Sequence, residues 1–235
     1  MQRREFIKTV SAAASTLALG ACTDSNDGAV VAQDSAKTTG TTYSLDSLFP
    51  RYTEYDPKVP TWCVTPDLDR CIHRFHLSSP FSPSGRYLGL TRLPREDRPP
   101  EPVDIAEIVL VDLTTGEQKV IAETIGWDTQ LGAQVQWGAS DKDLFFNDVD
   151  PDTWVPFGIR MDPVTGKTQK LNGTVYSISP DGKWAASASL RRIGATQAGY
   201  GVIVPNEHIP VNKGLVDDDG VYVTNTQTGE SQMVA

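Results

Sequence analysis

The stretch ISPDGKWAASASL, residues 178–190, is the third occurrence of one pattern in this chain. FSPSGRYLGLTRL (81–93) and WGASDKDLFFNDV (137–149) align with it, and each has a large apolar residue, a tight turn and an alternating strand. An apolar strand and a Thr-Gly turn follow each one, in AEIVLVDLTTGEQKVI (106–121), FGIRMDPVTGKTQKL (157–171) and GVYVTNTQTGESQMV (220–234). One unit therefore has four antiparallel strands, which is typical of a β-propeller blade.

The spacing of the repeat also favours an all-β propeller. The Thr-Gly glycines are Gly116, Gly166 and Gly229, and a blade usually repeats about every 40–50 residues. An immunoglobulin-like sandwich is the alternative, but it does not predict that both turn types recur in one order. We expect about three to four blades. Because propellers close with about 4–8 blades, we interpret the chain as the N-terminal part of a larger ring; a small ring completed by a partner is the alternative.

The N-terminus resembles an export signal. Residues 1–22, MQRREFIKTVSAAASTLALGAC, contain a twin-arginine pattern, a short apolar stretch and a lipobox that ends at Cys22. The alternative, an ordinary buried first helix, does not suit a double arginine followed by a polar segment. We expect Cys22 to be lipidated, 23–45 to be a flexible tether and 46–235 to be the partial propeller. The protein would then be exported and held in the cell envelope, on the periplasmic side or at the cell surface, by its lipid alone.

Charge and composition exclude several classes of function. The chain has 30 Asp and Glu against 21 Lys and Arg, a net charge of −9, which is the wrong sign for a nucleic-acid partner. Hydrophobic residues make up 39%, enough for a core. The sequence contains no G-x-S-x-G elbow, P-loop or H-E-x-x-H motif, so serine hydrolases, nucleotide enzymes and zincins have no support.

Two cysteines remain once Cys22 carries lipid. An exported pair such as Cys63 and Cys71 tends to oxidise, so a local disulfide is the favoured interpretation. The alternative is a site for a divalent metal made by Cys63, Cys71 and His73, with His76 nearby. These are ligand types that zinc accepts, although their spacing matches no standard zinc pattern.

Strand alternation predicts which face carries function. The short S-P-D-G and Thr-Gly turns share one face, and the long loops share the other, where binding residues usually lie. Aromatic and polar side chains gather in these long loops, a composition suited to gripping sugars; simple loop packing is the alternative. The expected sugar contacts are Trp127, Gln130, Gln134, Trp154, Arg191 and His208.

Longer strings suggest a family. CIHRFHLSSPFSPSGRYLGLTRLPREDRPPEP, GWDTQLGAQVQWG, LFFNDVDPDTW and TQAGYGV resemble the seven-bladed propellers of bacterial polysaccharide lyases of the ulvan-lyase and oligogalacturonate-lyase type. The resemblance covers about residues 50–235 and implies cleavage of a uronate-containing acidic polysaccharide by β-elimination. In those lyases His and Tyr serve as base and acid, with Arg or a His-held metal as the clamp on the carboxylate.

Three residues are the candidates for these roles in this chain. His76 would be the base or a metal ligand, Arg192 the clamp and Tyr200 the acid. Each has an alternative: a His bonded to a neighbouring loop, an Arg paired with local Asp, and a Tyr that plugs the space between blades. A second function from a different class also fits the sequence, namely a non-catalytic envelope propeller that binds glycan or protein through the same face.

Overall fold

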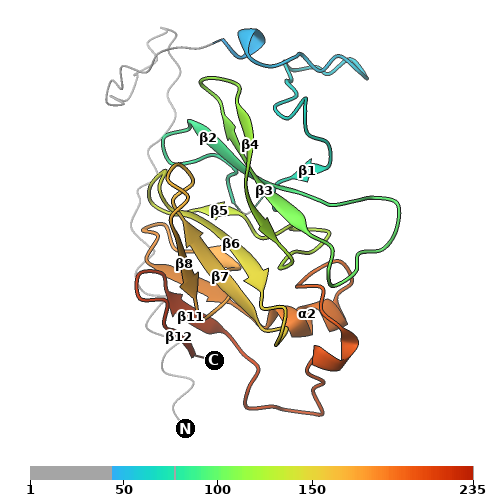
Figure 1. The fold of residues 1–235 in the computed structure, drawn as a ribbon, viewed down its shortest axis with the longest axis vertical. Coiled ribbons are helices and arrows are strands. Elements are labelled where there is room, and N and C mark those ends of the chain that lie inside the picture. The colour runs from blue at the N-terminus through green and yellow to red at the C-terminus, as the bar shows by residue number, and fades with distance from the viewer. Residues whose placement is uncertain (1–43, 77, 235) are drawn as a thin grey trace, which may run out of the picture. The chain divides into compact units, whose positions relative to one another are not determined.

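The structure is a computed structural model that describes residues 44–76 and 78–234. The export pattern, Cys22 and nearly all of the predicted tether lie outside this part of the chain. The described strands form three four-stranded antiparallel sheets, coloured green, yellow and orange to red in Figure 1. The strands are β1 Cys71–Ile72, β2 Tyr87–Arg92, β3 Ala106–Asp112, β4 Gln118–Thr124, β5 Gln136–Trp137, β6 Leu144–Val149, β7 Pro156–Met161, β8 Thr168–Leu171, β9 Ser177–Ile178, β10 Trp184–Ser187, β11 Tyr222–Asn225 and β12 Ser231–Met233.

Each sheet uses four consecutive strands, in the orders β1-β2-β3-β4, β5-β6-β7-β8 and β9-β10-β11-β12. The first turn closes in the same way each time: Ser82 N donates to Tyr87 O at 2.8 Å, Gly138 N to Asp143 O at 2.7 Å, and Ser179 N to Trp184 O at 2.8 Å. This common register confirms the alignment of the three repeats. The fold class predicted from the sequence, consecutive four-stranded propeller blades, is therefore confirmed, with three blades in the described residues.

Strand alternation packs each sheet against the next. Leu144 and Phe146 of β6 join the core cluster that contains Ile108 of the first sheet. Phe145, which lies between them in the sequence, packs with Val175 and Ala185 of the third repeat. Because successive side chains of a strand point to opposite faces, one buried strand supplies apolar side chains to both neighbours.

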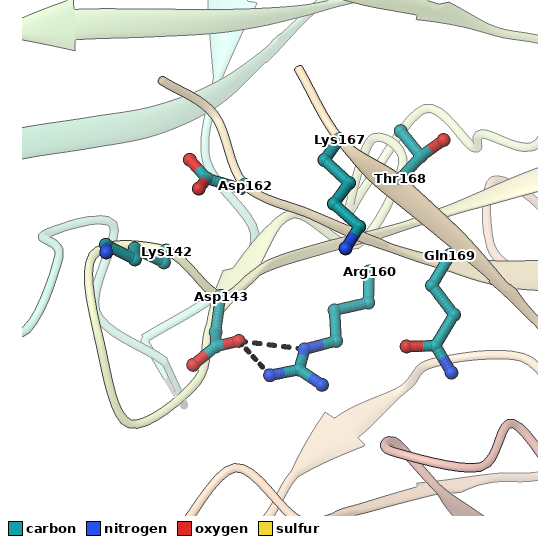
Figure 2. A pocket seen from close by; sticks show the side chains of 7 residues that line it. All are labelled: Lys142, Asp143, Arg160, Asp162, Lys167, Thr168 and Gln169. Atoms are coloured by element: carbon teal, nitrogen blue, oxygen red, sulfur yellow. Dashed lines mark hydrogen bonds and ion pairs between the residues drawn. The ribbon is translucent and has the colours of Figure 1, made fainter. Parts of the chain in front are cut away.

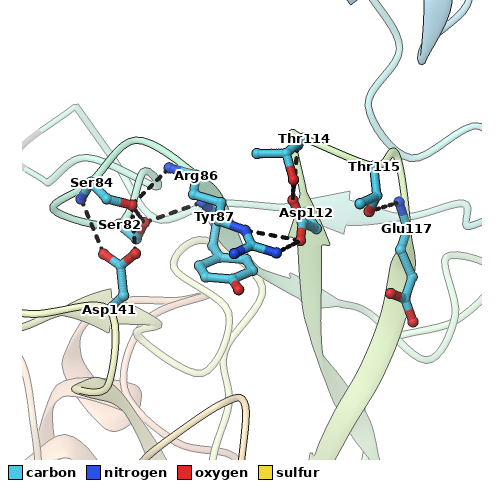
Figure 3. Close-up of polar contacts among 9 residues, drawn as sticks. All are labelled: Ser82, Ser84, Arg86, Tyr87, Asp112, Thr114, Thr115, Glu117 and Asp141. Carbon is cyan, nitrogen blue, oxygen red and sulfur yellow. Dashed lines mark hydrogen bonds and ion pairs between the residues drawn. The ribbon is translucent and has the colours of Figure 1, made fainter. Parts of the chain in front are cut away.

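Polar contacts also join the first two repeats at their turns. Asp141 accepts a hydrogen bond from Ser84 N at 3.0 Å and a second from Ser84 Oγ (Figure 3). Within the first sheet, Arg86 lies close to Asp112, with Nη2 to Oδ2 at 2.7 Å. These contacts lie at the ends of the strands that carry the short turns, as expected for a face whose role is structural.

The segment before the first repeat covers the outer side of sheet 1. Phe49 is buried with Leu88 and Val111, and Trp62 and Val64 pack on the same cluster. Between the 3₁₀ helix Leu45–Ser47 and β1, the strand content of this segment is an isolated bridge from Arg51 to Trp62. The segment is therefore a cover on the first blade and not part of a fourth blade.

The long insertion of the third repeat contains helical turns that strand periodicity did not predict. It includes α2 Leu190–Thr196 and the 3₁₀ helix Asn206–His208. Leu190, Val202 and Val204 are buried together with Val149 of β6. The insertion thus packs back onto the second repeat, and this brings its loops toward the innermost strands.

Candidate functional site

The innermost strand of the first sheet is interrupted. Cys71 and Ile72 pair with Arg92 and Thr91, the pairing then breaks, and Phe81 bridges to Leu88. Residues 73–76 and 78–79 leave the sheet between these two points. His73 and His76 therefore lie on a loop that projects from the middle of this strand.

A hollow of about 310 Å³ lies where this loop meets the innermost strands of the other two sheets. All three repeats contribute to its wall, as expected for the channel side of a propeller. The lining combines one cation with aromatic rings, hydroxyls and an amide. The lining residues are Arg74, Ser78, Ser79, Phe81, Pro83, Gln136, Trp137, Gly138, Tyr176, Ser177 and Ile178.

Arg74 is the charged residue of this wall. Its side chain is buried, with 4% of the residue exposed, and Nη1 donates to the carbonyl of Tyr176 while the guanidinium lies 5.2 Å from the Tyr176 ring. Its Nε has no hydrogen-bond partner, and no carboxylate among the described residues lies within ion-pair distance. Burial lowers the pKa of Arg74, an effect partly opposed by Tyr176 and Asp128. A buried cation without direct pairing is costly, so this position invites a negative charge.

Asp128 is the buried acid that influences Arg74. Its Oδ1 accepts from the amides of Gln130 at 2.9 Å and Leu131 at 2.6 Å, whereas Oδ2 has no partner. Burial raises the pKa of Asp128 to about 6, and the amides of Leu131, Gln130 and Gly201 and the charge of Arg74 oppose this rise. The carboxyl therefore titrates close to neutral pH.

Gln134, on the same connector as Asp128, is another buried polar residue with unpaired atoms. Only 1% of the residue is exposed, both side-chain amide atoms lack partners, and its φ of 61° lies in the left-handed region. Its backbone carbonyl accepts from Nε2 of Gln136, which also donates to the carbonyl of Tyr176. Unpaired buried polar groups and positive φ each cost free energy, and such costs gather at functional sites.

Several predicted site residues meet beside this connector. Phe75 contacts Tyr200 edge to face, with ring centroids 5.9 Å apart, and His76 follows Phe75 on the same loop. Gln130 N donates to Gly199 O at 3.1 Å, which joins the connector between sheets 1 and 2 to the insertion. The structure therefore brings together the loops that carry His76, Tyr200, Gln130 and Gln134.

Two predicted residues lie elsewhere. Arg192, expected to clamp a substrate carboxylate, pairs with Asp218 at 2.9 Å and approaches Asp219 at 3.7 Å. The abundant acids of the insertion thus occupy its guanidinium. Trp127, expected to stack on sugar, is 2% exposed in the main core, and its Nε1 donates to Asp104 O at 2.7 Å. Trp127 holds the 94–105 loop in place and offers no face to a ligand.

The other three predicted sugar contacts form a group of their own. The rings of Trp154 and His208 lie 6.1 Å apart, and Arg191 Nη1 donates to the carbonyl of His208 at 3.1 Å. Trp154 also packs on the cluster of Val149 and Leu190. These contacts correspond to the loop-packing alternative and fasten the insertion to the second repeat.

The cysteine predictions are not met by the structure. Cys63 is exposed and Cys71 half-buried, and both are free thiols. Cys71 packs on the apolar cluster under the N-terminal cover, and burial raises the pKa of its thiol. Across residues 44–76 and 78–234, no group of three or more His, Cys, Asp or Glu side chains could hold a metal ion. Cys63, Cys71 and His73 therefore do not form the predicted metal site.

A second hollow, of about 240 Å³, lies on the side of the short turns (Figure 2). Arg160 points to Asp143, and its Nε donates to Oδ1 at 2.8 Å. Ser140 Oγ donates to the other oxygen of Asp143 at 2.6 Å. Because the central charges of this hollow satisfy one another, we place the candidate site at the three-repeat hollow and not here.

Sequence reasoning assigned no role to the two charged residues at the centre of the site. Arg74 stands between His73 and His76 in CIHRFH, and Asp128 stands in GWDTQLG, so both lie in strings already singled out. The signal available in the sequence was a single charged residue beside apolar residues at the start of a repeat, which indicates a charge that could be buried. The partner of Arg74, Tyr176, is 102 residues away and could not be inferred from local pattern.

Comparisons with known proteins identify no family for this chain. No protein-family model matches the sequence, and no curated protein matches it significantly. TolB from Acinetobacter baumannii has 16% identity and a TM-score of 0.41 over 77% of this chain. A protein from Agrobacterium tumefaciens described as TolB has 15% identity and a TM-score of 0.31 over 65% of this chain. The chain spans 36% and 62% of the lengths of these two proteins.

In the part of the chain that the structure describes, no helix is long and apolar enough to cross a membrane.

Proposed function

We propose that this chain is a non-catalytic binding propeller that takes a carboxylate-bearing glycan in the three-repeat hollow. The observation that carries the proposal is Arg74, a buried guanidinium on the wall of the hollow with no carboxylate in ion-pair distance among the described residues. A guanidinium pairs well with a planar carboxylate, and burial strengthens that pairing. Although the chain carries a net charge of −9, the charged side chain that lines the hollow is the cation Arg74.

The rest of the wall suits an acidic sugar. Phe81 and Trp137 offer aromatic surface, while Ser78, Ser79 and Gln136 offer hydroxyl and amide groups. Aromatic rings with a few convergent polar groups are typical of small-molecule sites. β-Elimination needs a base as well, and the predicted base His76 is an exposed side chain that does not line the hollow. Binding without cleavage therefore accounts for the lining better than a lyase does.

The N-terminal sequence pattern supports a location in the cell envelope for this binding. Residues 1–22 match a twin-arginine lipoprotein signal, so we propose that the propeller is exported and anchored in the cell envelope through Cys22. Acidic polysaccharides reach proteins in that compartment. Labelling with a radioactive fatty acid, and its loss in Cys22→Ser, tests the anchor independently of the ligand.

The binding test is calorimetric titration of the full chain with an oligogalacturonate, with an uncharged galacto-oligosaccharide of equal length as the reference ligand. We expect binding of the acidic oligomer alone, and about 10–100-fold weaker binding for Arg74→Gln, because a charged hydrogen bond contributes about 1.5–3 kcal/mol. Arg51→Gln, which removes a charge from the N-terminal cover, is the matched control.

Two results would contradict the proposal. Equal affinity of Arg74→Gln and the unchanged chain would remove Arg74 from the site. A rise in ultraviolet absorbance from unsaturated uronate products would make the protein a lyase. Arg74→Lys separates charge from geometry, since it keeps the charge and loses the planar fork.

A further inference from the structure

A bound carboxylate has a consequence for the buried acid behind Arg74. Asp128 and Arg74 are both at least nine-tenths buried. Their loops meet at the insertion, where Gln130 N donates to Gly199 O and Phe75 packs on Tyr200, and the charge of each affects the other although they form no ion pair. In the free protein the ionised Asp128 balances the guanidinium. A ligand carboxylate at Arg74 would bring a second negative charge into the same low-dielectric region, and two carboxylates that share one cation repel each other.

We propose that Asp128 takes up a proton when a carboxylate ligand binds at Arg74, so that ligand binding and proton binding are coupled. The inference rests on the proposed function. The proton comes from solvent and the ligand carboxylate stays ionised, so Arg74 exchanges one counter-ion for another. Oδ2 is the oxygen that receives the proton, since it has no partner while Oδ1 accepts two backbone N–H bonds.

The surroundings of Asp128 make this exchange feasible. The amides of Gln130 and Leu131 face it from its own loop, and the amide of Gly201 faces it from the insertion. The charge of Arg74 acts on it from the loop in the innermost strand of the first sheet. Burial already holds the pKa of Asp128 at about 6, close to neutral pH. A modest further rise on ligand binding is therefore enough to change its charge at physiological pH.

Gln134 is a second buried polar residue on this connector with unpaired side-chain atoms. Its buried side-chain amide has an unpaired acceptor and an unpaired donor, and it lies on the same connector as Asp128. Arg74 Nε, Asp128 Oδ2 and the Gln134 amide are all unpaired, so each of these buried groups is free to form a new hydrogen bond when a charge in the region changes.

The experiment is calorimetric titration of the full chain with oligogalacturonate at pH 5.5, 6.5, 7.5 and 8.5, in two buffers of different ionisation enthalpy. We expect uptake of up to one proton per ligand, seen as a buffer-dependent heat, and a dissociation constant that rises at least ~10-fold from pH 5.5 to pH 8.5. Asp128→Asn, which keeps the acceptor for the two amides, should bind tightly at every pH with no proton uptake.

Two control variants identify the group that causes the pH dependence of binding. Asp152→Asn makes the same charge change on an exposed loop and should retain the pH dependence. His76→Asn removes the histidine that lies on the same loop as Arg74. Loss of the pH dependence in His76→Asn, or its persistence in Asp128→Asn, would overturn the coupling while leaving the binding function intact. Absence of binding at all four pH values would instead overturn the binding function.

Discussion

The side chain of Asn147 donates a hydrogen bond to the carbonyl of Val175 at 2.7 Å and accepts one from the amide of Val175, also at 2.7 Å. Asn147 lies in β6, and Val175 lies two residues before β9, so one buried amide group fastens the second sheet to the third. The equivalent residue of the first repeat is Thr91, whose Oγ1 accepts from Ala133 N at 3.0 Å. The repeat thus uses the same strand position to hold the chain that leads into the next sheet.

This contact predicts a graded loss of stability. Asn147→Ala leaves both backbone groups of Val175 buried and unpaired, and we expect it to lower the free energy of unfolding by about 2–4 kcal/mol. Thr91→Val keeps its shape and leaves one amide unpaired, so about 1–2 kcal/mol is expected. Urea denaturation of both variants checks the order. A larger loss for Thr91→Val than for Asn147→Ala would contradict the role given to the Asn147 amide.

Two glycines separate backbone strain from steric conflict. Gly166 has a φ of 75° and nothing within 4 Å of an added Cβ, whereas Gly132 has a φ of 61° and an added Cβ would lie 2.4 Å from Thr91 Oγ1. Gly166→Ala should therefore cost about 1 kcal/mol, the usual cost of positive φ. Gly132→Ala adds a clash with a buried side chain and should cost at least about 2 kcal/mol more. Equal shifts in melting temperature would show that the connector around Gly132 can move aside.

The architecture could be predicted from sequence because its determinants are local. The alternation of Leu144, Phe145 and Phe146 and the recurring turns fix strands, register and sheet order within a few residues. The same alternation predicted which face carries the long loops, and the contact between Gln130 and Gly199 joins two of those loops.

The centre of the site could not be predicted because its contacts are not local. Arg74 meets Tyr176 across 102 residues, and nothing near either residue encodes that contact. Arg192 is predicted to clamp a substrate carboxylate, but Asp218, 26 residues later, pairs with it instead. Trp127 was chosen for its type, yet its burial depends on how the first two sheets pack. Residue type suggests chemistry, and tertiary packing decides which residues remain available.

The two thiols give a direct test of the disulfide prediction. With Cys22→Ser, a chromogenic thiol reagent should titrate two free thiols in the protein purified without reductant. Exposed Cys63 should react quickly and half-buried Cys71 slowly, because burial raises the pKa of Cys71 and the thiolate is the reactive form. Cys63→Ser should remove the fast phase alone. Fewer than two free thiols in the unreduced protein would support the disulfide prediction and contradict the structure.

Asp128 also predicts how stability depends on pH. Its ordinary pKa of 3.8 is raised to about 6 in the folded chain, chiefly by burial, so the folded state holds this proton more tightly than the unfolded state. The resulting stabilisation is fully present below pH 3.8 and is lost as the pH rises through about 6. The difference between the two pKa values corresponds to about 3 kcal/mol at most. Asparagine does not titrate, so Asp128→Asn should not lose stability through this group as the pH rises.

The measurement is urea denaturation of the unchanged chain and Asp128→Asn at intervals from pH 4 to pH 8. Other carboxyls act in the opposite direction: burial works against ionisation of Asp112, yet Arg86 and Thr114 hold its pKa below the usual value. The difference in the free energy of unfolding between the two proteins therefore isolates Asp128. Relative to the unchanged chain, Asp128→Asn should become more stable by up to about 3 kcal/mol as the pH rises from 4 to 8. Asp152→Asn is the control for removal of one charge. A difference that stays constant across this range would mean that Asp128 keeps an ordinary pKa, and the coupling proposed at Arg74 would lose its proton acceptor.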